Sequence, residues 1–340
     1  MRPGSPLHLL LASAWVLVAI AAAATPTASS KQAKGSIEGI AMDGARVVYD
    51  VQGDLPRRCN RVFVWNVVSD VTTRVSGKGT CDADNTTTGG VAVRLAIAGT
   101  RVAWIVEQGS NSEVDDSLYA AGLGGPKERR LAYTRRTGSM LDPSLVGGWI
   151  GGLVGHGGLL AVNRWTTSKS GAIVDARLEL VGPKGLSLAV SGPASVEAQA
   201  ADSGRIAVLR PDDTVAVYAA GGELLRTIAP AAPHEVALAG RYLAVLTGKG
   251  RLEIYNARSG IRLRSWRVPA GAAHLDISGP TAAYTIPGEV RALRLTTGKD
   301  AVIARTRGQA NVQIEPAGLV YSVRSRLTFV PLARVLAQLS

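Results

Sequence analysis

Oxygen-bearing side chains alternate in the short stretch CDADN at residues 81–85. Asp82, Asp84 and Asn85 can offer carboxylate and amide oxygens to a hard cation, and Ca²⁺ prefers such ligands. The stretch lacks the glycine and the distal glutamate of a helix–loop–helix calcium loop. Two interpretations therefore stay open, namely a calcium site or a group of solvated loop acids without a cofactor.

Aromatic and charged side chains form a second group of candidates. Trp149 and Trp165 bracket one glycine-rich apolar stretch, and Arg164 adjoins the second tryptophan. Aromatic rings with polar neighbours suit sugars or peptides. Asp115 and Asp116 belong to a set of acids that concentrates between residues 54 and 116 of an otherwise basic chain. We treat these five residues as candidate ligand-binding residues, with packing between structural units as the alternative for the tryptophans.

Catalytic motifs have little support in this chain. The zinc pattern HExxH, the nucleophile elbow GxSxG and a phosphate-binding glycine loop are absent. His234 and His274 precede two successive strand-like segments at equivalent places, so both are expected near the centre of the fold, where they can bind a ligand or metal. His156 lies in a turn that we expect on the opposite face. Purely structural histidines are the alternative for all three.

The chain has two cysteines, Cys59 and Cys81. In an oxidising compartment such a pair is expected to form one disulfide, and a pair of free buried thiols is the alternative. A bridge that closes a loop of about twenty residues would stabilise the fold by roughly 3 kcal/mol.

The N-terminus has the pattern of a secretory signal peptide. Arg2 precedes an apolar run from Leu7 to Ile20, and residues 22–24 are three alanines, which fits an A-x-A cleavage site. We therefore expect residues 1–24 to be removed, residues 25–35 to form a flexible mature N-terminus and residues 36–340 to form one domain. An uncleaved anchor is the alternative. The expected location is secreted, periplasmic or within the cell envelope.

The charge of the chain indicates the class of its partners. The formal net charge is +12 at pH 7. A basic exported protein is expected to meet an anionic envelope polymer, a peptide or a protein rather than nucleic acid. A preference for arginine without a functional basic face is the alternative. After cleavage of the signal peptide no segment is apolar enough to span a membrane, and we expect a monomer.

One pattern recurs along the chain: an alternating apolar strand, a turn with glycine, and a second apolar strand. Clear copies are IAMDGARVVYDV from Ile40, LAIAGTRVAWIVE from Leu95 and VALAGRYLAVLTG from Val236. The turns centre near residues 44, 99, 157, 203, 240, 279 and 316, at intervals of about 37 to 58 residues. Such alternation predicts a β-hairpin, and a second hairpin follows most copies. The pattern predicts an all-β fold, a β-propeller with seven four-stranded blades.

Two hairpins carry a family resemblance. The stretches IYNARSGIRLRSW (254–266) and LRLTTGKDAVI (293–303) resemble the strand–turn–strand core of quinoprotein-type (PQQ-like) propeller repeats and of WD-type repeats. The resemblance implies a propeller over about residues 36–335. Recurrent Gly-His and Trp-Asp pairs are absent, and Cys59 and Cys81 are not the vicinal pair typical of PQQ-binding enzymes. The resemblance therefore implies the fold and not an enzyme activity.

Connections of uneven length suggest where binding takes place. The first three units have long polar connections at residues 51–60, 77–90, 107–117, 134–148 and 166–172. Long loops on a rigid scaffold usually carry binding. Our leading hypothesis is an exported, non-enzymatic binding or scaffold protein that presents these loops to an envelope polymer, peptide or protein. The alternative is a quinoprotein-like or lactonase-like propeller enzyme with an axial metal or cofactor.

The last predicted unit has too little chain for its own outer strand. Residues 332–339, or the segment around residues 34–37, can supply that strand and so close the ring. The first of these segments also has the only period that fits a helix.

Overall fold

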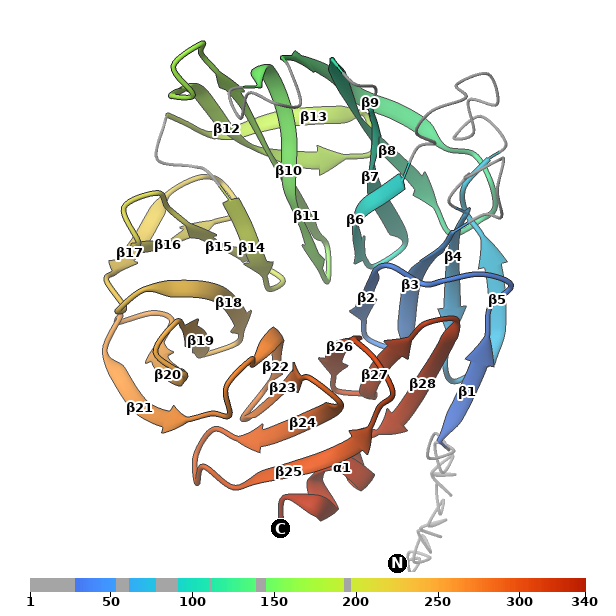
Figure 1. Cartoon of the computed structure of the whole chain (residues 1–340), viewed down its shortest axis with the longest axis vertical. Helices are drawn as coiled ribbons and strands as arrows, with labels where there is room; N and C mark the ends of the chain where they lie inside the picture. The colour runs from blue at the N-terminus through green and yellow to red at the C-terminus, as the bar shows by residue number, and fades with distance from the viewer. Residues whose placement is uncertain (1–27, 53–60, 78–90, 110–111, 139–144, 193–196) are drawn as a thin grey trace, which may run out of the picture.

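The computed structural model describes residues 28–52, 61–77, 91–109, 112–138, 145–192 and 197–340. These residues form strands β1 to β28 and one helix, α1 (Leu332–Gln338). The strands assemble into five sheets of four strands and one sheet of eight, all antiparallel. Figure 1 shows the sheets arranged around a central axis, as in a β-propeller. The predicted all-β propeller is confirmed.

The first sheet in chain order shows how one unit is built. It contains β2 (Ile40–Asp43), β3 (Arg46–Val51), β4 (Arg61–Asn66) and β5 (Val71–Arg74). The innermost strand comes first, and each later strand pairs with the one before it. Burial falls from β3, where five of six residues are buried, to β5, where none is. This gradient follows from the radial packing, because outer strands have fewer neighbours.

The next sheet is twice as wide. It contains β6 (Val91–Ala98), β7 (Arg101–Gly109), β8 (Glu113–Gly122), β9 (Arg129–Thr137), β10 (Val146–His156), β11 (Leu159–Thr167), β12 (Ile173–Gly182) and β13 (Gly185–Ser191). Two residue pairs, Val146 with Thr137 and Gly147 with Arg136, join its halves β6–β9 and β10–β13. Because the ladder runs through both halves, the predicted count of seven blades stays a prediction.

Three regular four-stranded sheets follow. Their strands are β14 (Glu197–Ala201), β15 (Arg205–Leu209), β16 (Val215–Ala219) and β17 (Leu224–Ile228); β18 (Pro233–Ala239), β19 (Tyr242–Thr247), β20 (Arg251–Asn256) and β21 (Arg262–Arg267); and β22 (Ala273–Ser278), β23 (Thr281–Ile286), β24 (Glu289–Arg294) and β25 (Asp300–Arg305). Tight turns join these strands, as their sequences predict.

The last sheet closes the ring with chain from both ends. It contains β26 (Ala310–Glu315), β27 (Gly318–Val323), β28 (Arg326–Pro331) and, at its outer edge, β1 (Ser29–Gln32). Lys31 on β1 reaches Asp70 of the first sheet at 2.8 Å, and the indole N–H of Trp65 donates to the same carboxylate at 2.9 Å. The segment 25–35 that we expected to be flexible therefore contains a strand. Residues 332–339 do not supply the outer strand, because Leu332–Gln338 is helical.

Apolar side chains from neighbouring sheets form the core. In one cluster Val47 and Trp65 of the first sheet pack with Val320 and Phe329 of the last, and all four are fully buried. Burial of a side chain of this size stabilises a fold by about 1.5–3 kcal/mol. Ring closure is thus an apolar contact as well as a strand pairing. No helix of the described residues is long and apolar enough to cross a membrane.

Several expected loops are not loops. Of the expected connection 107–117, most lies in the long strands β7 and β8; likewise 134–148 overlaps β9 and β10, and β11 extends to Thr167. These polar residues continue the ladder of the wide sheet. We predicted them to lie in loops because of their polarity. Residues 53–60 and 78–90 lie outside the described residues, and with them the candidates Cys59, Cys81, Asp82, Asp84 and Asn85.

Candidate functional site

The turns between first and second strands share one face of the ring, which we call the turn face. Arginine side chains link several of these turns to the next. Arg46 donates to the carbonyl of Gly99 at 3.1 Å, Arg101 donates to that of Gly158 at 2.6 Å, and Arg205 donates to that of Gly240. Arginine suits this role because its rigid guanidinium has five N–H donors. Parts of the turn face are therefore cross-linked between neighbouring units.

The first strands of the units surround a cavity on the axis. Its volume is about 300 Å³, and its wall consists of residues from β2, β6, β10, β14, β18, β22 and β26. Much of the lining is alanine, leucine and valine, but His156, Asp276 and Glu315 give it polar atoms. A cavity that is apolar along its wall and charged at a few points is the usual form of a small-ligand site.

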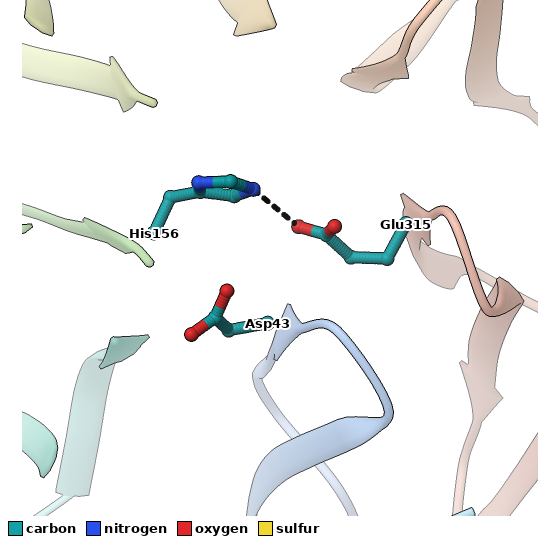
Figure 2. Close-up of side chains that lie close together, drawn as sticks. All are labelled: Asp43, His156 and Glu315. Atoms are coloured by element: carbon teal, nitrogen blue, oxygen red, sulfur yellow. Dashed lines mark ion pairs between the residues drawn. The ribbon is translucent and has the colours of Figure 1, made fainter. Parts of the chain in front are cut away.

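A cluster of three chemically active side chains lies at the turn-face end of this cavity. Asp43 ends β2, His156 ends β10 and Glu315 ends β26, and Figure 2 shows all three pointing toward a common centre. His156 Nε2 lies 3.2 Å from Glu315 Oε1. Each residue offers one ligand atom such that all three atoms lie within 4.8 Å of one another. We call these three residues the axial cluster.

Backbone groups hold the carboxylates of the axial cluster in place. Asp43 Oδ1 accepts a hydrogen bond from the N–H of Gly157 at 3.0 Å, and Oδ2 accepts one from Gly99. Glu315 accepts one from the N–H of Gly44. Gly99 has a φ of +59°, and a Cβ there would lie 2.9 Å from the Gly157 carbonyl oxygen. Glycine at this turn thus allows the close approach that brings Asp43 to two neighbouring turns.

The cluster has a distinct electrostatic character. The hydrogen bond between His156 and Glu315 raises the pKa of His156 to about 9. The negative charges of Asp43 and Asp276 also raise this pKa. Burial raises the pKa of Glu315 above its usual range, and burial also raises the pKa of Asp276 to about 7. The imidazole therefore carries a proton at neutral pH when nothing else binds it. The arrangement can hold a cation, whether a proton or a metal ion.

Our sequence analysis missed this cluster, although a signal for it was available. It placed His156 in a turn on the expected opposite face and did not single out Asp43 or Glu315. All three residues directly precede the residue at the centre of a repeat turn, as in Asp43-Gly44, His156-Gly157 and Glu315-Pro316. Equivalent positions of a propeller meet around its axis. Superposing the repeats and comparing that single position would have found the cluster.

The two histidines that we expected near the centre contribute to different cavities. His274 on β22 lines a second cavity of about 220 Å³ that shares wall residues with the axial cavity, together with Arg94 and Glu235. Its backbone has a φ of +54°, and its N–H donates to Glu235 at 3.0 Å. His234 on β18 is exposed and lines a different groove with Lys249 and Arg267. The two histidines therefore do not line one common cavity, and their role in ligand binding stays a prediction.

The tryptophan pair lies within the wide sheet. Trp149 and Trp165 are direct cross-strand partners, and their rings stack at 5.9 Å with an interplanar angle of 7°. The guanidinium of Arg136 lies 3.8 Å from the Trp149 ring centroid. The indole N–H of Trp149 donates to Thr167 at 3.1 Å. These contacts join β9, β10 and β11, so they favour packing over a ligand platform.

The remaining candidates from the sequence also have partners inside the wide sheet. Asp116 is buried and pairs with Arg136, while Asp115 accepts two hydrogen bonds from Arg135 at 2.7 and 3.0 Å. Arg164 pairs with Glu179 at 3.1 Å. The structure thus accounts for these side chains as links between strands, and their role in ligand binding stays a prediction.

A groove on the turn face is rich in arginine. It lies between sheet β14–β17 and sheet β18–β21, and its volume is about 940 Å³. Its charged lining residues are Asp202, Arg205, Glu223, Arg226, Arg241 and Arg258. Arg205 pairs with Asp202, whereas Arg226, Arg241 and Arg258 are exposed and make no ion pair with a described carboxylate. We call this surface the arginine groove.

Two arginines of the groove are held by local contacts. Arg226 Nε donates to the carbonyl of Arg258 at 2.8 Å, and Arg241 donates to the hydroxyl of Tyr242 at 2.7 Å. The guanidinium of Arg241 lies 4.8 Å from the Tyr242 ring centroid. Each contact leaves other N–H donors of the guanidinium free to face the groove. The groove is therefore preorganised to accept carboxylates or phosphates, which match the guanidinium fork.

Comparison with known proteins identifies the fold. No protein-family model matches the chain, and no curated protein matches it significantly. The WD40 β-propeller domain of Doa1 is similar with a TM-score of 0.55 and 12% identity, over 89% of this chain and 96% of that one. A chain of the Mitotic Checkpoint Complex is similar with a TM-score of 0.53 and 15% identity, over 97% and 99%. At these identities the likeness shows the β-propeller fold alone.

Proposed function

We propose that this protein is an exported, non-enzymatic propeller scaffold that binds a partner protein by holding an acidic segment of it in the arginine groove. The observation that carries the proposal is the set of three exposed arginines, Arg226, Arg241 and Arg258, that line one groove without a described carboxylate partner. Exposed ion pairs contribute about 0–1 kcal/mol each, so the proposal depends on several arginines of one groove acting on the same acidic segment.

Three further observations support the proposal. The formal net charge of +12 attracts acidic partners over a distance of about 10 Å at moderate ionic strength. The N-terminal sequence has the features of a signal peptide, which supports export. One of the similar structures is a complex of several proteins by its description, and the propeller fold that it shares with this chain offers a rigid face for such contacts.

The sequence predicts the long connections of the first three units as the binding surface. Most of the connections 51–60 and 77–90 lies outside the described residues, and others are parts of long strands. The arginine groove lies on the turn face and is formed by later units of the chain. The proposal therefore keeps the predicted class of function, binding to a protein or peptide, and changes the surface.

A binding experiment with charge-matched variants tests the proposal. Fluorescence anisotropy would follow a labelled oligoglutamate peptide as the purified protein is added. The test variant replaces Arg226, Arg241 and Arg258 by serine. The control replaces Arg264, Arg267 and Arg305, which are exposed outside the groove, so both variants lose the same charge. We expect at least a tenfold weaker affinity for the groove variant and less than a threefold change for the control.

Either of two results would contradict the proposal. Equal losses in both variants would mean that net charge alone attracts the peptide. Binding of polyphosphate at the groove without binding of oligoglutamate would mean that the partner is an anionic polymer and not a protein. Unchanged melting temperatures of both variants would establish that the groove variant is folded.

A further inference from the structure

The axial cluster has the spacing of a metal site. His156 Nε2 and Glu315 Oε1 are 3.2 Å apart. Bonds of about 2.0–2.1 Å in a tetrahedral zinc site place neighbouring ligand atoms about 3.3 Å apart. One edge of a tetrahedron is thus already formed, and the ligand atom of Asp43 lies within 4.8 Å of the other two. A three-ligand site would form when the carboxylate oxygen of Asp43 moves to bonding distance of the same ion.

Backbone N–H groups hold both carboxylates of the axial cluster, as hydrogen-bond donors hold the ligands of many metal sites. Ligating carboxylates are usually held by further hydrogen bonds that fix their direction. Here the N–H groups of Gly99 and Gly157 hold Asp43, and the N–H of Gly44 holds Glu315. These donors belong to the backbone of the cross-linked turn face, so their position does not depend on flexible side chains. The orientation of both carboxylates is therefore held by backbone hydrogen bonds without a bound ion.

The ligand atom of His156 faces the cluster and can be reached from the cavity. Nε2 is the imidazole nitrogen beside the carboxylates, since it lies 3.2 Å from Glu315 Oε1. The imidazole side chain as a whole is 34% exposed, and the axial cavity beside it gives an ion a route to Nε2.

We infer that Asp43, His156 and Glu315 bind one divalent transition-metal ion of the zinc class at the turn-face end of the axial cavity. One imidazole and two carboxylates suit such an ion better than Ca²⁺ or Mg²⁺, which prefer oxygen ligands alone. Three protein ligands leave a fourth position, which opens toward the cavity. The site joins three units of the ring, so the ion would also cross-link the turn face. It shares no residue with the arginine groove and does not depend on the proposed function.

Metal titration of the purified, chelator-treated full chain tests the inference. Isothermal titration calorimetry with ZnCl₂ is expected to give one ion per chain, and Co²⁺ is expected to give the visible absorption of a tetrahedral site. Zinc should also raise the melting temperature. His156→Ala and Glu315→Gln should each weaken zinc binding at least tenfold. His234→Ala is the matched control, because His234 is exposed in another groove, and it should leave the affinity unchanged.

Several results would overturn the inference. Zinc binding that is absent or not saturable would do so, and so would binding that survives His156→Ala but is lost in His234→Ala. Equal affinity for Ca²⁺ would refute the assigned class of metal. If His156→Ala does not fold, His156→Gln keeps the size of the side chain and removes the imidazole. Retention of full zinc affinity in that variant would equally refute the site.

Discussion

The wide sheet β6–β13 and the regular sheet β18–β21 join their neighbours in different ways. In the wide sheet, the outer strand β9 is hydrogen-bonded to β10. Beside this junction, buried Arg136 pairs with Asp116 of β8 and with Glu107 of β7 at 2.6 Å, and Asp116 also accepts a hydrogen bond from the N–H of Ile150 on β10 at 3.1 Å. The regular sheet meets sheet β22–β25 through an apolar cluster that includes Leu246, Leu252 and Tyr284, among other residues. Two neighbouring units of one ring can therefore be joined by a continuous strand ladder, or by an apolar cluster with a few hydrogen bonds, such as those from the N–H groups of His274 and Leu275 to Glu235.

The outer edges of the two sheets reflect this difference. The free edge strand β21 carries the exposed residues Arg262, Arg264 and Arg267. Charged side chains on an open edge oppose pairing with another sheet. On β9 the corresponding strand end is paired, and Arg136 there is only 3% exposed. Arg262 on β21 also pairs with a carboxylate, that of Glu253 at 3.2 Å, yet its side chain stays 59% exposed. The comparison teaches that the pairing of the strand, and not an ion pair by itself, decides whether a basic residue lies on an open edge or inside a sheet.

Loss of the buried arginine tests the polar junction most directly. Arg136→Ala would leave the buried carboxylate of Asp116 without its cation, and such a loss typically lowers the free energy of unfolding by about 3–5 kcal/mol. Urea denaturation measures this change. The double variant Arg136→Met with Asp116→Leu removes both charges and should recover most of the stability. A loss below about 1 kcal/mol in the single variant would mean that the junction does not depend on this pair.

Asp50 in the first sheet contrasts with Asp116. It is also a buried acid, but backbone N–H groups hold it in place of an arginine. It accepts hydrogen bonds from the N–H groups of Glu38 and Gly39 at 3.1 and 2.7 Å, and burial raises its pKa to about 7. The folded protein thus binds a proton that the unfolded chain releases near pH 4. The bound proton therefore contributes fully to the free energy of unfolding below about pH 4. As pH rises to about 7 this contribution is lost, and the free energy of unfolding falls by at most about 4 kcal/mol.

The variant Asp50→Asn isolates this pH dependence, because asparagine does not titrate. The free energy of unfolding of both proteins would be measured from pH 4 to pH 8. We expect the stability of the native chain, relative to the variant, to fall across this range. A constant difference between the two proteins would show that Asp50 does not titrate in this window.

The smallest expected effect concerns the exposed neighbour of the junction. Arg135 pairs with Asp115 at 2.7 Å, but its side chain is 49% exposed. Exposed ion pairs contribute about 0–1 kcal/mol, so Arg135→Ala should lower the free energy of unfolding by less than 1 kcal/mol. Urea denaturation beside Arg136→Ala gives the comparison. A loss as large as that of Arg136→Ala would mean that burial does not separate the two adjacent pairs.

The sequence by itself determined the local structure. Period-two alternation and turn glycines such as Gly44, Gly99 and Gly240 specify hairpins through neighbours in the chain, so the all-β propeller was predictable. The sequence pattern was misleading where polar residues such as Asp115 and Arg135 pair across two strands. A run of polar residues is typical of a loop, so the pattern predicted a loop there. There the partner strand, and not the residue itself, decides the structure.

Tertiary structure alone decided which distant segments meet. Closure of the ring by β1, the junction of β9 with β10 and the convergence of Asp43, His156 and Glu315 all join residues far apart in the chain. No local pattern encodes such pairings, because their free energy comes from contacts that exist only after the ring has closed. Each residue of the axial cluster is ordinary in its own turn. Its chemistry arises from the shared axis, which brings equivalent positions of separate repeats together.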